Sequence, residues 1–597
     1  MKKPILTNWN NVANLKSLLL FAQLLDEMLY HQTIDSYKAP VLNTHSLCDE
    51  FINVSQEIQV GFLPSIAIKP IKAELAANLQ DDDVAKEILG HNYEHIKNKL
   101  ITDDKTENFV ADIQIVKDIL DKEYFNKLKD SLANLIINEP GERKKITKIA
   151  RLFVTELLYK GYSEEYLHRV TQDFFFSKKS IHDTEQIKIF FSKFSDKPKK
   201  WKVVFKGTMD YDFLKGTSLL KKLSIKVGKR VTWKIGKKNK FEVKFIKEKS
   251  NEYPIYIICD TEDQMDPYSA RRNVEYLLKF INNLVTCHDH KKSLDNDSSV
   301  LFEKALVYEN NRYTTTTKNS LEPMEKIPQK NGDLKNDIEE MTNILDNMVS
   351  PSFYTIINSL NSHSCAVKSK TFENQLLSLW IGMETLLPPP AYKDQPIIEN
   401  FTLSINPFLG REYIQKLMDD LHNSIKNCLS SDEYDRIFST LPENNNEVEK
   451  IAMLISIREY DGILQDLCNQ LITNELLPWR IFELTQKFRN SNEVLSTIKQ
   501  HDQRIEWQLR RIYRTRNLIT HKGRLTEYLP RLLENTHVYY HTVLNLITKN
   551  SVSKKDSIVT LNDIFALVKF EHQAHKKYLE KSRIDCNQDN FKILLFG

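Results

Sequence analysis

The stretch QRIEWQLRRIYRTRNLIT, residues 503–520, decides the fold of the C-terminal part of the chain. At about 100° per residue, Ile505, Leu509 and Ile512 fall on one apolar stripe, which predicts a single amphipathic helix. Basic residues and then Gly523, a common helix terminator, close the stretch. The same helical periodicity recurs after about residue 336 and predicts an all-helical C-terminal domain.

The composition excludes several classes of protein. A chain of 597 residues exceeds what one hydrophobic core usually supports, which predicts several domains. The 84 Lys and Arg nearly balance the 80 Asp and Glu, and the formal charge of +4 identifies no partner by itself. The apolar stretches are far shorter than the roughly 20 residues of a membrane span, so no membrane partner is expected. Seven scattered cysteines without a C-x-x-C pair argue against a disulfide scaffold and fit a reducing cytoplasm.

The periodicity of the apolar residues changes along the chain and indicates a mainly α fold with a central α/β domain. Residues 1–180 are predicted to be a helical region, 181–313 a basic α/β domain, 314–335 a linker and 336–597 the C-terminal helical domain. Asp266-Pro267 is predicted to begin a helix, with the carboxylate as its cap. The strands predicted in the central domain are Trp201–Phe205, Leu223–Val227, Phe241–Ile246 and Tyr256–Cys259.

One charged residue interrupts the apolar stripe of the 503–520 helix. Arg516 stands where another aliphatic side chain is expected. A guanidinium cannot lose its proton, so in a buried seam it needs a carboxylate, a phosphate or water as partner. Tyr513, Asn517 and His521 follow one another at i, i+4 spacing in an adjacent polar row. We therefore expect Arg516, Asn517 and His521 to converge on one anion near the helix end.

The pattern R-N-x-x-x-H near the end of a long helix resembles the ribonuclease motif of the HEPN superfamily. The stretch Phe372–Glu384 is similar to an early helix of the C-terminal domain in ApeA-like anti-phage HEPN proteins. Residues 336–597 are therefore expected to form a HEPN helical bundle. Arg531–His537 also fits a looser form of the motif but lacks the asparagine after the arginine. The alternative for Arg516 and His521 is a structural role at the helix C-terminus.

The resemblance implies an endoribonuclease that cuts RNA, such as tRNA, without metal or cofactor. The ribose 2′-hydroxyl would attack the adjacent phosphate and leave a 2′,3′-cyclic phosphate. His521 would transfer the proton, Arg516 would neutralise the phosphorane oxygens and Asn517 would orient either group. Tyr513 is expected to contact RNA. Arg514 and Lys522 are expected to bind the RNA backbone or to lie in solvent.

The resemblance also implies a homodimer whose active site is shared, with the stripe that carries Arg516 facing the partner. Glu384 is an isolated carboxylate in the nearly all-apolar run Leu376–Leu387, so it needs a partner. That partner is expected to be Arg516, either as support for the site or as a purely structural ion pair. A regulated antiviral, abortive-infection role follows from the resemblance alone, with a phage-derived or nucleic-acid trigger sensed by residues 1–330.

Two other hypotheses compete with the ribonuclease. The helical domain could be a non-catalytic RNA-binding or protein-interaction module. In the central domain, Glu242 and Lys244 with the upstream Asp210 and Asp212 resemble the D…E-x-K pattern of metal-dependent nucleases. The lysine-rich segment 193–249, interleaved with aromatic residues, suits either nucleic-acid contact or a solvated sheet face. No phosphate-binding glycine loop occurs, and Cys287–His290 lacks the second ligand pair of a zinc site.

Overall fold

The structure, a computed structural model, confirms that the fold is mainly α with one small antiparallel sheet. It describes residues 6–30, 32–102, 106–177, 180–207, 218–228, 255–288, 304–309, 312–317, 323–326, 339, 342, 348–471, 473–552 and 560–597. The chain divides into two compact units. Unit 1 comprises residues 1–153, 178–184 and 323–597, and unit 2 comprises residues 154–177 and 185–322.

Unit 1 combines helices from both ends of the chain. Its N-terminal elements are η1 (Val12–Asn14), α1 (Lys16–Leu29), α2 (Thr44–Gln59), η2 (Ser65–Ala67), α3 (Ile68–Asp81), α4 (Asp83–Leu89), α5 (Asn92–Thr102), α6 (Thr106–Asn138) and most of α7 (Arg143–Tyr159). Local capping explains where some of them begin: Asn43 and Ser46 form a reciprocal capping box at the start of α2.

The C-terminal elements of unit 1 form most of its core. They are η3 (Pro323–Glu325), α16 (Ser350–Lys368), α17 (Phe372–Leu386), α18 (Ile397–Arg411), α19 (Tyr413–Cys428), α20 (Ser431–Phe438), α21 (Glu447–Ser456), η4 (Arg458–Tyr460), α22 (Asp461–Gln470), α23 (Leu476–Phe488), α24 (Ser491–Lys522), α25 (Leu529–Val552), α26 (Leu561–Ser582) and α27 (Phe591–Phe596). Helices α19 to α24 share one apolar cluster with α27.

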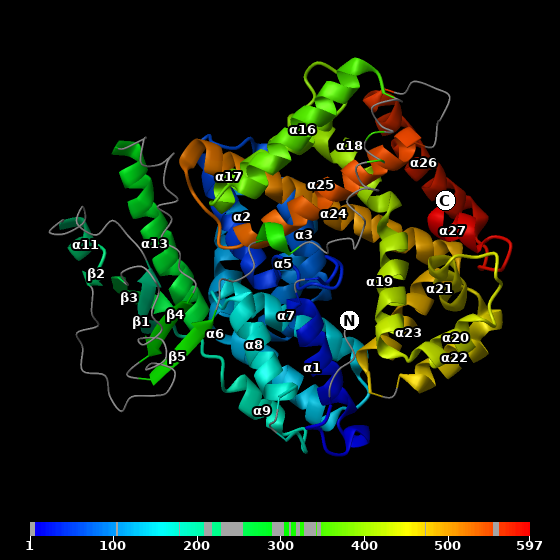
Figure 1. Cartoon of the computed structure of the whole chain (residues 1–597), viewed down its shortest axis with the longest axis horizontal. Helices are drawn as coiled ribbons and strands as arrows, with labels where there is room; N and C mark the ends of the chain where they lie inside the picture. Colours follow the sequence, from blue (N-terminus) through cyan, green and yellow to red (C-terminus); the bar gives the residue numbers. More distant parts are fainter. Residues whose placement is uncertain are drawn as a thin grey trace. The chain divides into compact units, whose positions relative to one another are not determined.

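Helix α24 is the long helix predicted from residues 503–520, and it lies among other helices of unit 1 (Figure 1). Asn490 caps its start by accepting a hydrogen bond from the backbone N–H of Glu493 at 3.0 Å. Gly523 ends it in the left-handed conformation, with φ at 59°, as the sequence predicted. The helix contacts α18, α23 and α26, and also α3 from the N-terminal part of the chain. The apolar stripe of α24 is therefore covered within one chain.

Unit 2 contains a five-stranded antiparallel sheet of order β2-β3-β1-β4-β5. Helix α13 packs on one face of the sheet and buries Val274 and Leu278 against Val203 and Ile257. Asp266 caps this helix by accepting from the backbone N–H groups of Tyr268 and Ser269, as predicted. The elements of the unit are α8 (Glu164–Phe175), α9 (Gln186–Phe191), β1 (Lys199–Gly207), α11 (Ser218–Lys222), β2 (Ile225–Gly228), β3 (Ile255–Gln264), α13 (Pro267–His288), β4 (Lys304–Glu309) and β5 (Arg312–Thr317).

Three of the four predicted strands correspond to β1, β2 and β3, and Phe241–Ile246 lies outside the described residues. The sequence analysis did not identify β4 and β5. Thr314–Thr317, placed in a linker on composition, form part of the edge strand β5. Threonine is β-branched and favours extended backbone, so this run of threonines was itself a strand signal.

Candidate functional site

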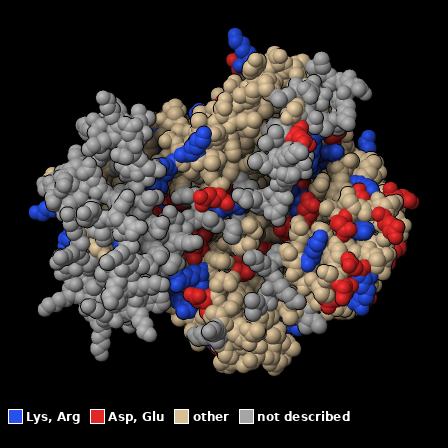
Figure 2. Space-filling view, in the orientation of Figure 1, with Lys and Arg blue, Asp and Glu red and all other residues tan. Residues whose placement is uncertain are grey.

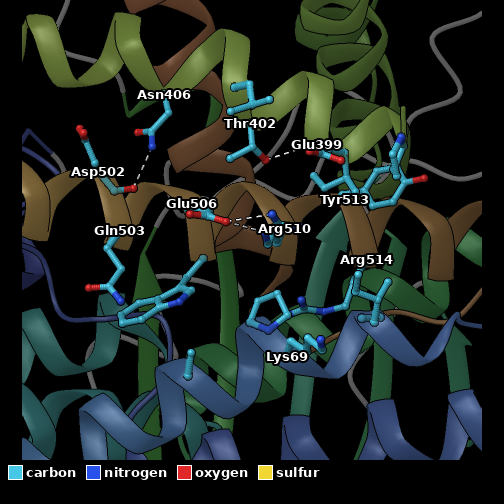
Figure 3. A pocket seen from close by; sticks show the side chains of 18 of the residues that line it. Lys69, Glu399, Thr402, Asn406, Asp502, Gln503, Glu506, Arg510, Tyr513 and Arg514 are labelled. Carbon is cyan, nitrogen blue, oxygen red and sulfur yellow. Dashed lines mark hydrogen bonds and ion pairs between the residues drawn. The ribbon is translucent and has the colours of Figure 1, made fainter. Parts of the chain in front are cut away.

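A groove with a volume of about 1320 Å³ runs along one face of α24 in unit 1. Its other walls come from α3 and the loop before it, from α18 and from α26. Figure 3 shows side chains of α24 between Thr402 and Asn406 of α18 on one side and Lys69 of α3 on the other. The lining residues of α24 recur every three or four positions, as one helix face requires: Asp502, Gln503, Glu506, Trp507, Arg510, Tyr513, Arg514, Asn517 and His521.

Asn517 and His521 lie at the groove, but Arg516 does not line it. Arg516 is half-buried on the apolar stripe and donates from Nη1 to Oδ1 of Asn517 at 3.0 Å. The expected convergence of all three side chains on one anion is therefore not seen. The reason is helical geometry: five residues rotate the chain by about 500°, which leaves Arg516 about 140° around the helix from His521. Arg516 reaches the groove only through Asn517.

Glu384 does not form the expected pair with Arg516. Its Oε2 accepts a hydrogen bond from the indole Nε1 of Trp380 at 2.6 Å, and it has no ion-pair partner among the described residues. Trp380 stacks on Phe401 at 4.0 Å and contacts Tyr513 at 5.5 Å between ring centroids. Because Glu384 is only half-buried and accepts from an indole N–H, the carboxylate needs no buried cation. Glu384 is connected to the groove through the rings of Trp380 and Tyr513.

Arg514 lines the groove, but its guanidinium is buried and paired rather than free in solvent. It is 8% exposed and donates to Oε1 of Glu50 in α2 at 2.8 Å. Lys522 lies 3.6 Å from Glu57 and 4.0 Å from the ring centroid of Phe62. Both cations therefore join the end of α24 to α2 and to the loop that follows α2. His521 is exposed at this end of the groove, with its ring 6.1 Å from that of Phe62.

Two lysines and one glutamate, Glu399, line the groove without an ion-pair partner among the described residues. Lys69 of α3 and Lys569 of α26 line the groove, are exposed, and have no ion-pair partner within the part of the chain that the structure describes. Arg510 also lines it, but Glu506 one turn earlier accepts its guanidinium hydrogen bonds, at 2.9 Å from Nε. Trp507 and Tyr513 also line the groove, so the lining combines charge with aromatic surface.

The other end of the groove carries a cluster that the sequence analysis missed. Oδ2 of Asp502 lies 2.9 Å from Nε2 of His572 and 2.7 Å from Nζ of Lys576. Burial opposes ionisation of Asp502, but these two neighbours outweigh it and lower the pKa of the carboxyl. A side chain at Gly410 would fall 2.7 Å from Oδ1 of Asp502, so only glycine permits this close approach of α18. The sequence pattern that indicates this cluster is the i, i+4 spacing of His572 and Lys576 on α26, which makes the two side chains neighbours on one helix face.

The residues proposed for a metal-dependent nuclease, Asp210, Asp212, Glu242 and Lys244, lie outside the described residues, as do the side chains of Cys287–His290. Figure 2 shows Lys, Arg, Asp and Glu interspersed on the described surface of the face it draws, rather than one field of a single sign.

Comparison of the chain with models of protein families, with curated proteins and with solved structures finds no match. Within the described residues, every helix is too short or too polar to cross a bilayer.

Proposed function

We propose that the groove along α24 binds a single-stranded segment of RNA and that His521 cleaves it, as an endoribonuclease of the HEPN type. The observation that carries the proposal is the position of Asn517 and His521, the last two residues of the R-N-x-x-x-H pattern, at a groove with unpaired lysines. From Gln503 to His521 the α24 wall is about 27 Å long at about 1.5 Å per residue, enough for several nucleotides. Cations along the backbone and aromatic faces for bases are how proteins hold single strands.

The chemistry needs one proton acceptor and one proton donor. The 2′-oxygen forms a bond to phosphorus as the bond to the 5′-oxygen breaks, which leaves a 2′,3′-cyclic phosphate and a 5′-hydroxyl. One imidazole can accept the proton of the 2′-hydroxyl or donate one to the leaving oxygen, and His521 is exposed for one of these two transfers. Solvent water in the open groove exchanges the other proton. The groove lysines supply positive charge for the phosphate, and Asn517, held by Arg516, orients the reacting groups.

The proposal extends to a second subunit and to a defence role. The apolar stripe of α24 is covered within the chain, so it does not require a partner subunit. A shared site would instead use the exposed end of α24 at His521 and Lys522. An antiviral effector in the cytoplasm, switched on by a phage-derived or nucleic-acid trigger, remains part of this proposal.

The second candidate function is RNA binding without cleavage. The separation of Arg516 from the groove favours it, because the cation expected at the phosphorane would then act on phosphate only through Asn517.

The purified chain is incubated with tRNA in buffer without added divalent metal, and both RNA binding and new cyclic-phosphate ends are measured. Cleavage that is lost in His521→Ala but kept in Thr520→Ala supports the enzyme, since Thr520 is exposed on the same helix outside the groove. Binding without cleavage in the wild type supports the second candidate. Cleavage that survives in His521→Ala, or that requires Mg²⁺, contradicts a catalytic His521.

A further inference from the structure

Three histidines from two helices of unit 1 meet away from the groove. His363 lies on α16, and His537 and His541 lie one turn apart on α25. Nε2 of His537 is 2.9 Å from Nε2 of His363 and 3.1 Å from Nε2 of His541. One ring nitrogen from each residue lies within 4.8 Å of the other two. None of the three residues lines the groove of α24.

Hydrogen bonds within the cluster cannot satisfy the ring of His537. The Nε2 atom of a neutral imidazole carries either one proton or one lone pair, so Nε2 of His537 makes one good hydrogen bond to a neighbouring ring. It has two such neighbours at hydrogen-bonding distance. Nδ1 of His537 is also buried without a hydrogen-bond partner in the described structure. Convergence of this kind is costly unless something else occupies the point between the rings.

Burial disfavours the protonated form of His363 and His537. His537 is 3% exposed, and its burial, with His541 and His363 beside it, lowers its pKa to about 3. Burial also lowers the pKa of His363. Burial of His363 and His537 favours the neutral imidazole, the form in which histidine offers a lone pair to a metal ion.

The surroundings hold these rings in place. The ring of Tyr540 stacks on that of His363, with centroids 4.8 Å apart and planes 8° from parallel. The hydroxyl of Tyr540 lies 3.1 Å from Oγ of Ser359, one turn before His363 on α16. Ser359 in turn donates to the carbonyl oxygen of Gly382 in α17 at 2.7 Å. Partners of this kind fix the orientation of metal ligands before the metal binds.

We propose that His363, His537 and His541 bind one Zn²⁺ ion through their Nε2 atoms. Tetrahedral zinc with Zn–N bonds of about 2.1 Å places its ligand nitrogens about 3.4 Å apart, so two of the contacts need to open by only a few tenths of an ångström. Imidazole favours zinc and its transition-metal neighbours over Ca²⁺ or Mg²⁺, which prefer oxygen ligands. Three protein ligands leave the fourth position to a water molecule, and His363 and His541 are half-buried, so solvent reaches the ring edges.

The proposed site joins α16 to α25 independently of the function of the groove. Two of the three ligands can be recognised in the sequence, because the segment His537–His541 has the H-x-x-x-H spacing that places two imidazoles on one helix face. The third ligand lies 174 positions earlier. Only the packing of α16 against α25 shows that the three belong together.

The test is the metal content of the full-length chain and its absorption spectrum with cobalt. The wild type is expected to hold about one Zn²⁺ per chain and, with Co²⁺ in its place, to show the visible bands of tetrahedral cobalt. His363→Ala and His541→Ala are expected to lose both signals. The matched control is the double variant His91→Ala/His95→Ala, which removes an exposed pair with the same spacing near α5 and is expected to keep both.

One substitution separates loss of the ligand from loss of the fold. His541→Cys keeps a ligand of zinc, so it is expected to retain metal and to add a sulfur-to-cobalt charge-transfer band in the near ultraviolet. Retention of one metal per chain in both His363→Ala and His541→Ala would overturn the proposal. So would a His541→Cys protein that folds, as judged by its circular dichroism, and shows no such band.

Discussion

Arg511 of α24 binds both carboxylate oxygens of Glu50 in α2, which lies 461 positions earlier in the chain, at 3.0 and 2.8 Å. The same guanidinium donates to Glu74 of α3 at 2.6 Å, and Arg514 donates to Glu50. All four side chains are buried. This ion cluster connects the helix that carries Asn517 and His521 to two helices from the other end of the chain.

Removal of Arg511 is expected to destabilise the protein strongly. Arg511→Ala leaves Glu50 and Glu74 as neighbouring buried carboxylates, and breaking a buried ion pair in this way costs about 3–5 kcal/mol. The free energy of unfolding in urea, followed by tryptophan fluorescence, measures the effect. Lys499→Ala is the control, since Lys499 lies on the same helix as Arg511, forms an exposed ion pair with Glu580 of α26 and should change stability by at most about 0.5 kcal/mol. A loss below about 1 kcal/mol in Arg511→Ala would contradict the role of the cluster.

The same cluster predicts loss of stability in acid. Burial raises the pKa of Glu50, but Arg511 and Arg514 outweigh it and lower the pKa to about 2. A carboxyl whose folded pKa is depressed stabilises the fold above its unfolded pKa, and that contribution is lost as pH falls from about 5 towards 2. The pKa of Glu74 is raised by burial, so its protonation in the folded state offsets part of the loss.

Unfolding free energies measured from pH 6 to pH 3 are therefore expected to fall less steeply in Glu50→Gln than in the wild type. Equal slopes would show that the pKa of Glu50 is not lowered in the folded state. One proton taken up on unfolding corresponds to about 1.4 kcal/mol per pH unit, so the difference in slope is measurable.

Arg516 and Asn517 are expected to act as one unit in RNA cleavage. Because Arg516 contacts Asn517 and does not line the groove, Arg516→Ala and Asn517→Ala should lower kcat by similar factors, with little change in KM. The double variant should be no slower than the slower single variant, which is the mark of coupled residues. Multiplicative losses would mean that Arg516 acts on the substrate by another route. His521→Ala should cost about 10²–10⁴-fold, the usual contribution of proton transfer.

Lys69 and Lys569 are expected to set the salt dependence of RNA binding. Each phosphate contact that is lost should reduce the slope of log K against log salt concentration by about 0.7 for a single strand. Lys69→Ala and Lys569→Ala are compared with Lys577→Ala, since Lys577 is an exposed lysine of α26 outside the groove. Fluorescence anisotropy of labelled RNA at several salt concentrations gives the slopes. The same reduction in Lys577→Ala would argue against the groove as the binding surface.

Sequence patterns predicted helices and helix ends correctly where each pattern depends only on residues that are close together in the chain. The apolar stripe of α24, its end at Gly523 and the cap of α13 at Asp266 all depend on residues within a few positions of one another. The position of Arg516 relative to His521 was mistaken because two residues can be close in sequence and still point to different sides of a helix. The ion pair of Arg514 with Glu50 was not predicted, because the two residues are far apart in the sequence.

The mainly helical fold, the end of the longest C-terminal helix and the residues that share one face of that helix could all be predicted from the sequence. Only the packing of the helices shows that Arg511 and Arg514 bind Glu50, that Asp502 lies beside His572, and that His363 meets His537 and His541. The physical reason is the range of the interactions. Periodicity and capping act over one or two helical turns, whereas buried ion pairs and ligand clusters form only where packing brings distant helices together.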